Sequence, residues 1–111
     1  MKKKNVTFKI VDEEYVLQHS IRMTLLRCLQ EGLTNAKRHG HATEVIVTLS
    51  FLEHEVELVI HDNGTGTDQV EYGFGLSSMK ERLAALNGEL QVDSNKKQGT
   101  MVKCQIPFRR G

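Results

Sequence analysis

Two neighbouring runs of alternating apolar residues constrain the fold of this chain more than any other feature. Apolar side chains occupy every second position in both runs: Val45, Val47, Leu49 and Phe51, then Val56, Leu58 and Ile60. Alternation with a period of two is typical of strands that bury one face. The polar link Glu53-His54 between the runs is short enough for a hairpin. The sequence therefore predicts two antiparallel strands whose inner face must be covered by other elements.

Asp62 stands at the end of the second run and falls on the same inward side as Leu58 and Ile60. Burying a neutral polar group without a hydrogen bond costs about 2–7 kcal/mol, and burying a carboxylate costs more. Gly64 and Gly66 follow at once, so the backbone can turn sharply and let a ligand approach closely. We therefore interpret this segment as a socket for the polar, planar edge of a ligand.

Five further segments have the periodicity of regular structure. Residues 6–10 alternate as a strand, residues 20–39 and 76–86 have helical periods, and residues 90–92 and 102–106 form a closing hairpin. The apolar faces of the helices consist of Leu25, Leu26, Leu29, Leu33 and Ala36, and of Leu76, Met79, Leu83 and Leu86. This order predicts an α+β fold, a two-layer α/β sandwich with a mixed sheet of about five strands and helices on one face.

The ends of both helices are also marked. Ser20 is a suitable N-cap for the first helix, and Gly40 is a suitable residue to follow its C-terminus. Asn87 and Gly88 are expected to end the second helix.

Length and composition exclude several classes of protein. The 111 residues suffice for one domain, and the formal net charge of +1 gives no case for a nucleic-acid partner. No apolar run approaches the roughly 18–20 residues of a membrane span, so we expect a cytoplasmic domain, whose parent protein can still be membrane-anchored. Cys28 and Cys104 lack metal-ligand spacing and are expected to be buried thiols, and the five histidines lack zinc spacing.

Glu31, Asn35 and Arg38 line up on the polar side of the first helix at i, i+4 and i+7. Taken alone, such a row is a solvated helix face. Asn35 and the adjacent Gly32 both disfavour a helix interior, Gly32 by about 1 kcal/mol relative to alanine, which indicates a constraint from a close neighbour. A carboxylate, an amide oxygen and a guanidinium can together hold a hydrated Mg²⁺ and a phosphate chain.

Gly73 and Gly75 precede the second helix, where free backbone N–H groups can form an anion site. A flexible loop before an ordinary helix is an equally good interpretation. The pattern matches neither a dinucleotide-binding GxGxxG motif nor a P-loop. The pair Gly99-Thr100 is most simply a hairpin turn, with ligand contact as the alternative.

Taken in chain order, four motifs resemble the nucleotide-binding boxes of the Bergerat-fold ATPases. They are Glu31-x-x-x-Asn35, Asp62-x-Gly64-x-Gly66, Gly73-x-Gly75-Leu76 and Gly99-Thr100. They are most similar to the catalytic, ATP-binding domain of bacterial sensor histidine kinases. Residues 30–39 and 75–83 resemble the subgroup with a short ATP lid, which includes the DesK and nitrate-sensor kinases. The resemblance implies that the chain binds ATP and Mg²⁺.

The resemblance also implies a role for each site residue. Asp62 would accept a hydrogen bond from the adenine amino group, Asn35 would bind Mg²⁺, and Glu31 would act through a metal-bound water or orient the phosphoryl group. Arg38 would contact phosphate oxygens. The other nucleotide-binding residues would be Gly64, Gly66, Gly73 and Gly75 as lid hinges, Leu76 and Ser77 at the phosphates, and His39 and Thr100.

The function implied is that of a histidine protein kinase catalytic domain, with residues 1–111 as one ATP-binding domain. It would transfer the γ-phosphoryl group to a histidine on a separate helical dimerisation domain, from which a response regulator receives it. That domain is missing from the chain, so we expect a monomer that binds ATP but transfers little phosphate alone, within a homodimeric parent. The alternatives are a protein serine kinase of the anti-sigma-factor type and a non-catalytic nucleotide-binding module.

Overall fold

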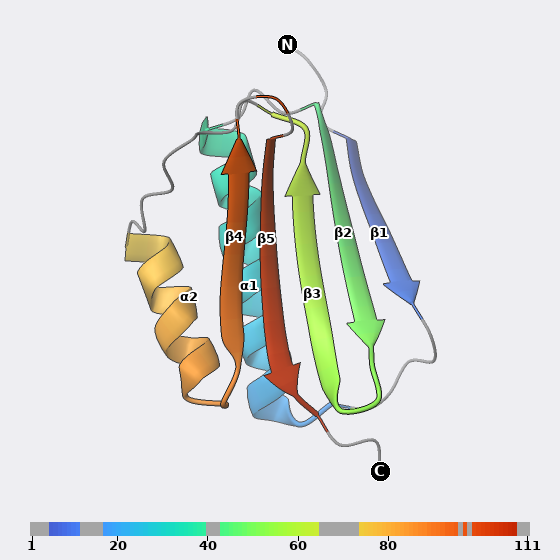
Figure 1. Cartoon of the computed structure of the whole chain (residues 1–111), viewed down its shortest axis with the longest axis vertical. Helices are drawn as coiled ribbons and strands as arrows, with labels where there is room; N and C mark the ends of the chain where they lie inside the picture. Colours follow the sequence, from blue (N-terminus) through green and yellow to red (C-terminus); the bar gives the residue numbers. More distant parts are fainter. Residues whose placement is uncertain are drawn as a thin grey trace.

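The computed structural model describes residues 5–11, 17–39, 43–64, 74–95, 97 and 99–108. Two helices and five strands follow one another in the predicted order (Figure 1). They are β1 (Asn5–Val11), α1 (His19–His39), β2 (Glu44–Phe51), β3 (Glu55–Asp62), α2 (Phe74–Ala84), β4 (Glu89–Asn95) and β5 (Gly99–Pro107).

The five strands form one mixed sheet in the order β1-β2-β3-β5-β4. The pair β1–β2 is parallel, and the other three pairs are antiparallel. Both helices lie against the same face of the sheet (Figure 1). The predicted fold class, a two-layer α+β sandwich with helices on one face, is confirmed.

Gly32 lies where α1 packs on the sheet. A Cβ atom at this position would overlap Cδ1 of Ile60, a core residue of β3 that is only 2% exposed. The missing side chain therefore lets α1 approach β3 closely, which offsets the low helix propensity of glycine. The close neighbour expected from the sequence is thus the sheet itself.

Several expected details of the helices are wrong. The helix α1 begins at His19, and the amide of Arg22 donates to the carbonyl oxygen of Gln18 at 3.0 Å, so Ser20 lies inside the first turn and is not the N-cap. Leu26 is 45% exposed and is not part of the buried stripe. The other predicted members are confirmed: Leu25 and Ala36 are buried, and Leu29 and Leu33 pack against the core. Ile21 and Cys28 belong to the buried stripe as well.

The helix α2 begins at Phe74, two residues earlier than expected. Asn87 and Gly88 end it, as predicted. Asn87 has a positive φ of 60°. The amide of Asn87 donates to the carbonyl oxygen of Ala84 at 3.0 Å, and the amide of Gly88 donates to that of Leu83 at 2.7 Å. These two bonds are a Schellman motif, in which Asn tolerates the left-handed conformation that ends the helix.

The strand β1 carries exposed apolar side chains, because neither helix extends over this edge of the sheet (Figure 1). Val6, Phe8 and Ile10 are 42%, 62% and 55% exposed. Their register partners on β2 include Val45 and Val47, which are buried on the helix-covered face. The alternation in the sequence therefore identified the strand correctly, although these side chains do not belong to the core.

Cys28 of α1 and Cys104 of β5 are fully buried free thiols, as expected. They are hydrogen-bonded to each other, and this bond together with burial raises the pKa of Cys104. Their contact joins α1 to β5 in the middle of the core. In the described part of the chain, no helix is both long enough and apolar enough to cross a membrane.

Candidate functional site

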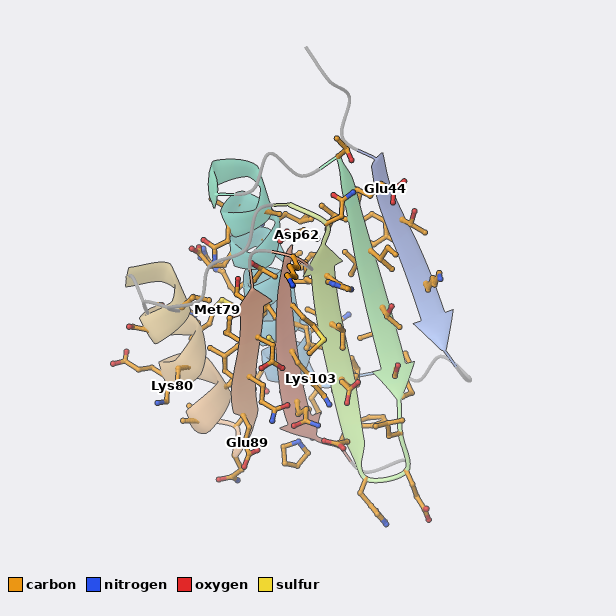
Figure 2. All side chains as sticks on the ribbon, turned by 45° about the horizontal axis from the view of Figure 1, so that its top comes forward. Glu44, Asp62, Met79, Lys80, Glu89 and Lys103 are labelled. Atoms are coloured by element: carbon orange, nitrogen blue, oxygen red, sulfur yellow. The ribbon has the colours of Figure 1, made fainter. Side chains whose placement is uncertain are left out.

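Asp62 is the last residue of β3 and is 7% exposed (Figure 2). It lies on the helix-covered face with Leu58 and Ile60, as the alternation predicted. Its Oδ1 atom accepts a hydrogen bond from the backbone amide of Gly64 at 2.9 Å. This bond closes a short turn directly after the strand, so the carboxylate is held at one end of the core.

The next residue, Asn63, fixes this turn to the start of β2. Its Oδ1 atom accepts hydrogen bonds from the amides of Thr43 at 3.0 Å and Glu44 at 2.9 Å. Its Nδ2 group donates to Oγ1 of Thr43 at 3.0 Å, and its own amide donates to the Glu44 carbonyl oxygen at 3.1 Å. This role of Asn63 is not visible in the sequence. Asn is typical of turns, but partners 19 and 20 residues away leave no local signal.

Asp62, Thr100 and Ser94 form a row of polar residues across three neighbouring strands. Asp62 on β3 pairs with Thr100 on β5, and Thr100 pairs with Ser94 on β4. The hydroxyl oxygens of Ser94 and Thr100 are 2.8 Å apart. Three polar side chains from three neighbouring strands therefore share one end of the helix-covered face. Ser94 was not singled out from the sequence, because its partner depends on the register of the closing hairpin.

Gly99 packs against the turn that follows Asp62. It has a φ of +84°, and a Cβ atom here would lie 3.0 Å from the carbonyl carbon of Asp62 and 3.1 Å from the amide nitrogen of Gly64. Only glycine fits both the conformation and the space. Gly99 and Thr100 begin β5 and pair with Asn95 and Ser94 across the closing hairpin, so they belong to the strand and are not the turn itself. Gly99 also lies against the Asp62 turn, and Thr100 pairs with Asp62.

Glu31 and Gly75 bring the two helices together. A Cβ atom on Gly75 would overlap the carboxylate of Glu31, so this carboxylate lies directly against the first turn of α2. Glu31 and Asn35 are both half-buried, one turn apart on the same side of α1. The missing side chain at Gly75 is what leaves room for the Glu31 carboxylate between the helices.

Gly32 of α1 packs against Ile60 of β3. This contact brings the end of β3 with Asp62 and the part of α1 with Glu31 and Asn35 to the same end of the molecule. Asp62 lies two residues beyond Ile60 on β3, and Asn35 lies about one turn beyond Gly32 on α1. Both elements run in the same direction in Figure 1. The end of β3, the C-terminal half of α1 and the N-terminus of α2 therefore surround one candidate site.

The remaining predicted site residues have different positions. Ser77 lies exposed in the first turn of α2, whereas Leu76 is half-buried and packs against the core. Arg38 and His39 belong to the last turn of α1, but their side chains lie outside what the structure describes. Gly66 and Gly73 also lie outside the described residues.

The donor set at this end fits a hydrated magnesium ion bound together with phosphates. In the described segments, no group of three or more His, Cys, Asp or Glu side chains could hold a metal by itself. Mg²⁺ commonly uses one or two protein oxygens and completes its shell with water and phosphate oxygens. The half-buried Asn35 and Glu31 offer one amide oxygen and one carboxylate for this purpose.

Comparisons with known proteins agree with this architecture. The sensor histidine kinase LnrJ of Bacillus subtilis (strain 168) is 37% identical over 99 residues, which are 89% of this chain and 25% of LnrJ. DegS of Brevibacillus brevis, a signal transduction histidine-protein kinase/phosphatase, is 34% identical over 106 residues, covering 93% of this chain and 28% of DegS. The chain thus spans about a quarter of the length of these curated relatives.

The fold also matches that of solved histidine kinases. Full-length ShkA in complex with AMPPNP superposes with a TM-score of 0.81 at 20% identity, over 96% of this chain and 26% of ShkA. The expected resemblance to sensor histidine kinases is confirmed, whereas the short-lid subgroup stays a prediction. Because residues 20–110 match its sequence pattern, the chain belongs to the family of histidine kinase-, DNA gyrase B- and HSP90-like ATPases.

Proposed function

We propose that this chain is the catalytic domain of a sensor histidine kinase, which binds Mg-ATP and transfers the γ-phosphoryl group to a histidine on a separate helical domain. The observation that carries the proposal is the buried Asp62 carboxylate, held beside Gly64 and Gly99 at the end of the sheet. The relatives LnrJ and DegS, named as histidine kinases and 37% and 34% identical, support the choice of histidine as acceptor.

Adenine would bind at the end of β3. One oxygen of Asp62 already accepts the Gly64 amide, and the carboxylate retains further lone pairs for the amino group of the base. A charge-assisted bond in a partly dehydrated site is stronger than a neutral one. Gly99 and Thr100 would border the same edge of the base, because both lie against the Asp62 turn or pair with it.

The triphosphate would extend from this socket toward the two helices. Asn35 would ligate Mg²⁺, and Glu31 would contact it through a bound water or orient the phosphoryl group. Backbone amides at the start of α2, around Gly75 and Ser77, suit phosphate oxygens. On the grounds of motif alone, we also assign phosphate contacts to Arg38, His39 and Leu76, and hinge positions beside the nucleotide to Gly66 and Gly73.

Transfer requires in-line attack of a histidine ring nitrogen on the γ-phosphorus, with cleavage of the bond to the bridging oxygen and release of ADP. The bound Mg²⁺ would supply charge neutralisation on the phosphate oxygens. The chain itself contributes mainly by positioning and by excluding water. The position of the Glu31 carboxylate at the junction of α1 and α2 supports the role proposed for it.

Residues 1–111 would form one catalytic domain of a longer, dimeric kinase. Its helical acceptor domain and its response regulator would be the protein partners, and the cytoplasm, where ATP is available, would be its location. A monomeric fragment would then bind ATP but need added acceptor for transfer.

Labelled phosphate distinguishes the candidate reactions. The chain is incubated with [γ-³²P]ATP, Mg²⁺ and a purified histidine-bearing helical domain from a kinase such as LnrJ. We expect label on the acceptor that is lost in acid and kept in alkali, as a phosphohistidine is. Acid-stable label would indicate a serine kinase. Tight ATP binding without any label, even with several acceptor domains, would indicate a non-catalytic nucleotide-binding module.

A further inference from the structure

The hydroxyl groups of Ser94 and Thr100 form a hydrogen-bonded pair next to Asp62, in which either oxygen can be the donor. The described contacts of the Ser94 hydroxyl include two acceptors for its one proton: Oγ1 of Thr100 at 2.8 Å and the Gly99 carbonyl oxygen at 3.4 Å. Hydroxyl hydrogen bonds are best at about 2.7–2.8 Å, so the nearer acceptor is favoured. When Ser94 donates to Thr100, the single proton of Thr100 is left for another acceptor.

The position of Thr100 decides where that proton points. Thr100 lies directly across from Asp62, and side chains in such cross-strand pairs have Cβ atoms about 4.5–5.5 Å apart. The two groups can therefore contact adjacent atoms on one edge of a planar base. Asp62 offers an acceptor and Thr100 offers a donor. This pair is complementary to a base edge on which a donor lies next to an acceptor.

An acceptor at Asp62 next to a donor at Thr100 distinguishes adenine from guanine. Adenine presents its N6 amino donor beside the N1 acceptor, whereas guanine presents its O6 acceptor beside an N1–H donor. Guanine would thus place two donors face to face at Thr100 and two acceptors face to face at Asp62. A buried polar group left unpaired costs more than an ordinary hydrogen bond contributes.

We propose that Ser94 is a specificity-determining positioning residue, which holds the Thr100 hydroxyl as a donor and thereby favours adenine over guanine. This inference rests on the proposed binding of adenine nucleotides at Asp62. Without Ser94, the Thr100 hydroxyl can rotate and accept from the N1–H group of guanine.

Nucleotide binding to the chain tests this proposal. Dissociation constants of Mg-ATP and Mg-GTP are measured by calorimetry for wild type, Ser94→Ala, Ser94→Thr and a control, Ser50→Ala, which removes a hydroxyl from β2. We expect Ser94→Ala to weaken ATP binding about fivefold, the effect of one hydrogen bond, with GTP binding unchanged or tighter. Ser94→Thr restores the ATP preference, and Ser50→Ala keeps it.

A double-mutant cycle separates positioning from general damage. In a Thr100→Val background, Ser94→Ala should have no further effect on the ATP-to-GTP ratio, because its target hydroxyl is gone. An equal loss of ATP and GTP affinity in Ser94→Ala, or an unchanged ratio, overturns the role of Ser94. If wild type binds neither nucleotide, the proposed function itself is wrong, and that outcome is distinct from a failure of Ser94 alone.

Discussion

Replacing Gly75 by alanine should separate stability from function. The added methyl group would overlap the Glu31 carboxylate, which is the far end of a flexible, half-buried side chain. Rotating that side chain to a less favourable geometry costs about 0.5–1.5 kcal/mol. Replacing glycine by alanine in a compatible helical conformation gains about 0.4–1 kcal/mol. The free energy of unfolding should therefore stay within about 1 kcal/mol of wild type.

The effect on phosphotransfer should be much larger. A displacement of about 1 Å in a catalytic group can cost about 100-fold in rate, and the Glu31 carboxylate must move by at least that much to admit a methyl group. Urea unfolding gives the stability, and the rate of label transfer from [γ-³²P]ATP to an added acceptor domain gives the function. We expect a stable variant with a transfer rate about 100-fold lower.

Two further variants identify the cause. If the methyl group acts through Glu31, the double variant Glu31→Ala/Gly75→Ala should transfer no more slowly than Glu31→Ala alone. In contrast, Gly88→Ala should unfold easily, because there a Cβ atom would meet the backbone carbonyl oxygens of Gln105 and Leu83, which cannot rotate away. A Gly75→Ala protein with normal transfer, or one destabilised by more than about 2 kcal/mol, would refute the reasoning.

Variants at three other positions test the surroundings of the site and the core. Asn63→Ala removes the acceptor of two backbone amides, so it should lower the free energy of unfolding by about 1–3 kcal/mol and also lower ATP affinity. Asn63→Asp keeps that acceptor, so urea unfolding and calorimetry should show a smaller loss of stability and of ATP affinity. Gly99→Ala is strained at φ +84° and collides with the Asp62 backbone, so a loss of only a few tenths of a kcal/mol would contradict the described contact. Because the hydrogen bond to Cys28 and burial raise the pKa of Cys104 above that of an unfolded thiol, near 8.5, the wild-type free energy of unfolding should fall as pH rises above that value. Between pH 7 and 9.5, the free energy of unfolding should fall less for Cys104→Ala than for wild type. Equal pH dependence of the two proteins would show that the folded protein does not retain the proton on Cys104.

The sequence was sufficient to predict features that depend on local periodicity. Alternation identified the strands and placed Asp62 on the inner face, because side-chain direction in a strand follows directly from position. The end of α2 was equally local, since Asn87 supplies the left-handed conformation of a Schellman motif and Gly88 supplies its second amide hydrogen bond. For the same reason the fold class followed from the order of the elements.

Features that depend on pairing between distant segments were not predictable. The helical period includes Leu26 in an apolar face, but only the position of α1 over β3 and β5 leaves this side chain exposed. The partner of Ser94 depends on the register of β4 and β5, and the partners of Asn63 lie at the start of β2. The cause of the unfavourable Gly32 was likewise visible only once Ile60 was seen against it.

The most direct test of the account is whether Asp62 recognises the amino group of adenine. Calorimetry would compare Mg-ATP with purine riboside triphosphate, which carries hydrogen in place of that amino group, on wild type, Asp62→Ala and Asp62→Asn. The asparagine variant retains an oxygen for the Gly64 amide and so controls for the turn. A hydrogen bond to a charged group predicts that wild type prefers ATP by about 10- to 100-fold and that both variants lose this preference. Equal binding of the two nucleotides by wild type, or a full preference for ATP in Asp62→Ala, would contradict the account.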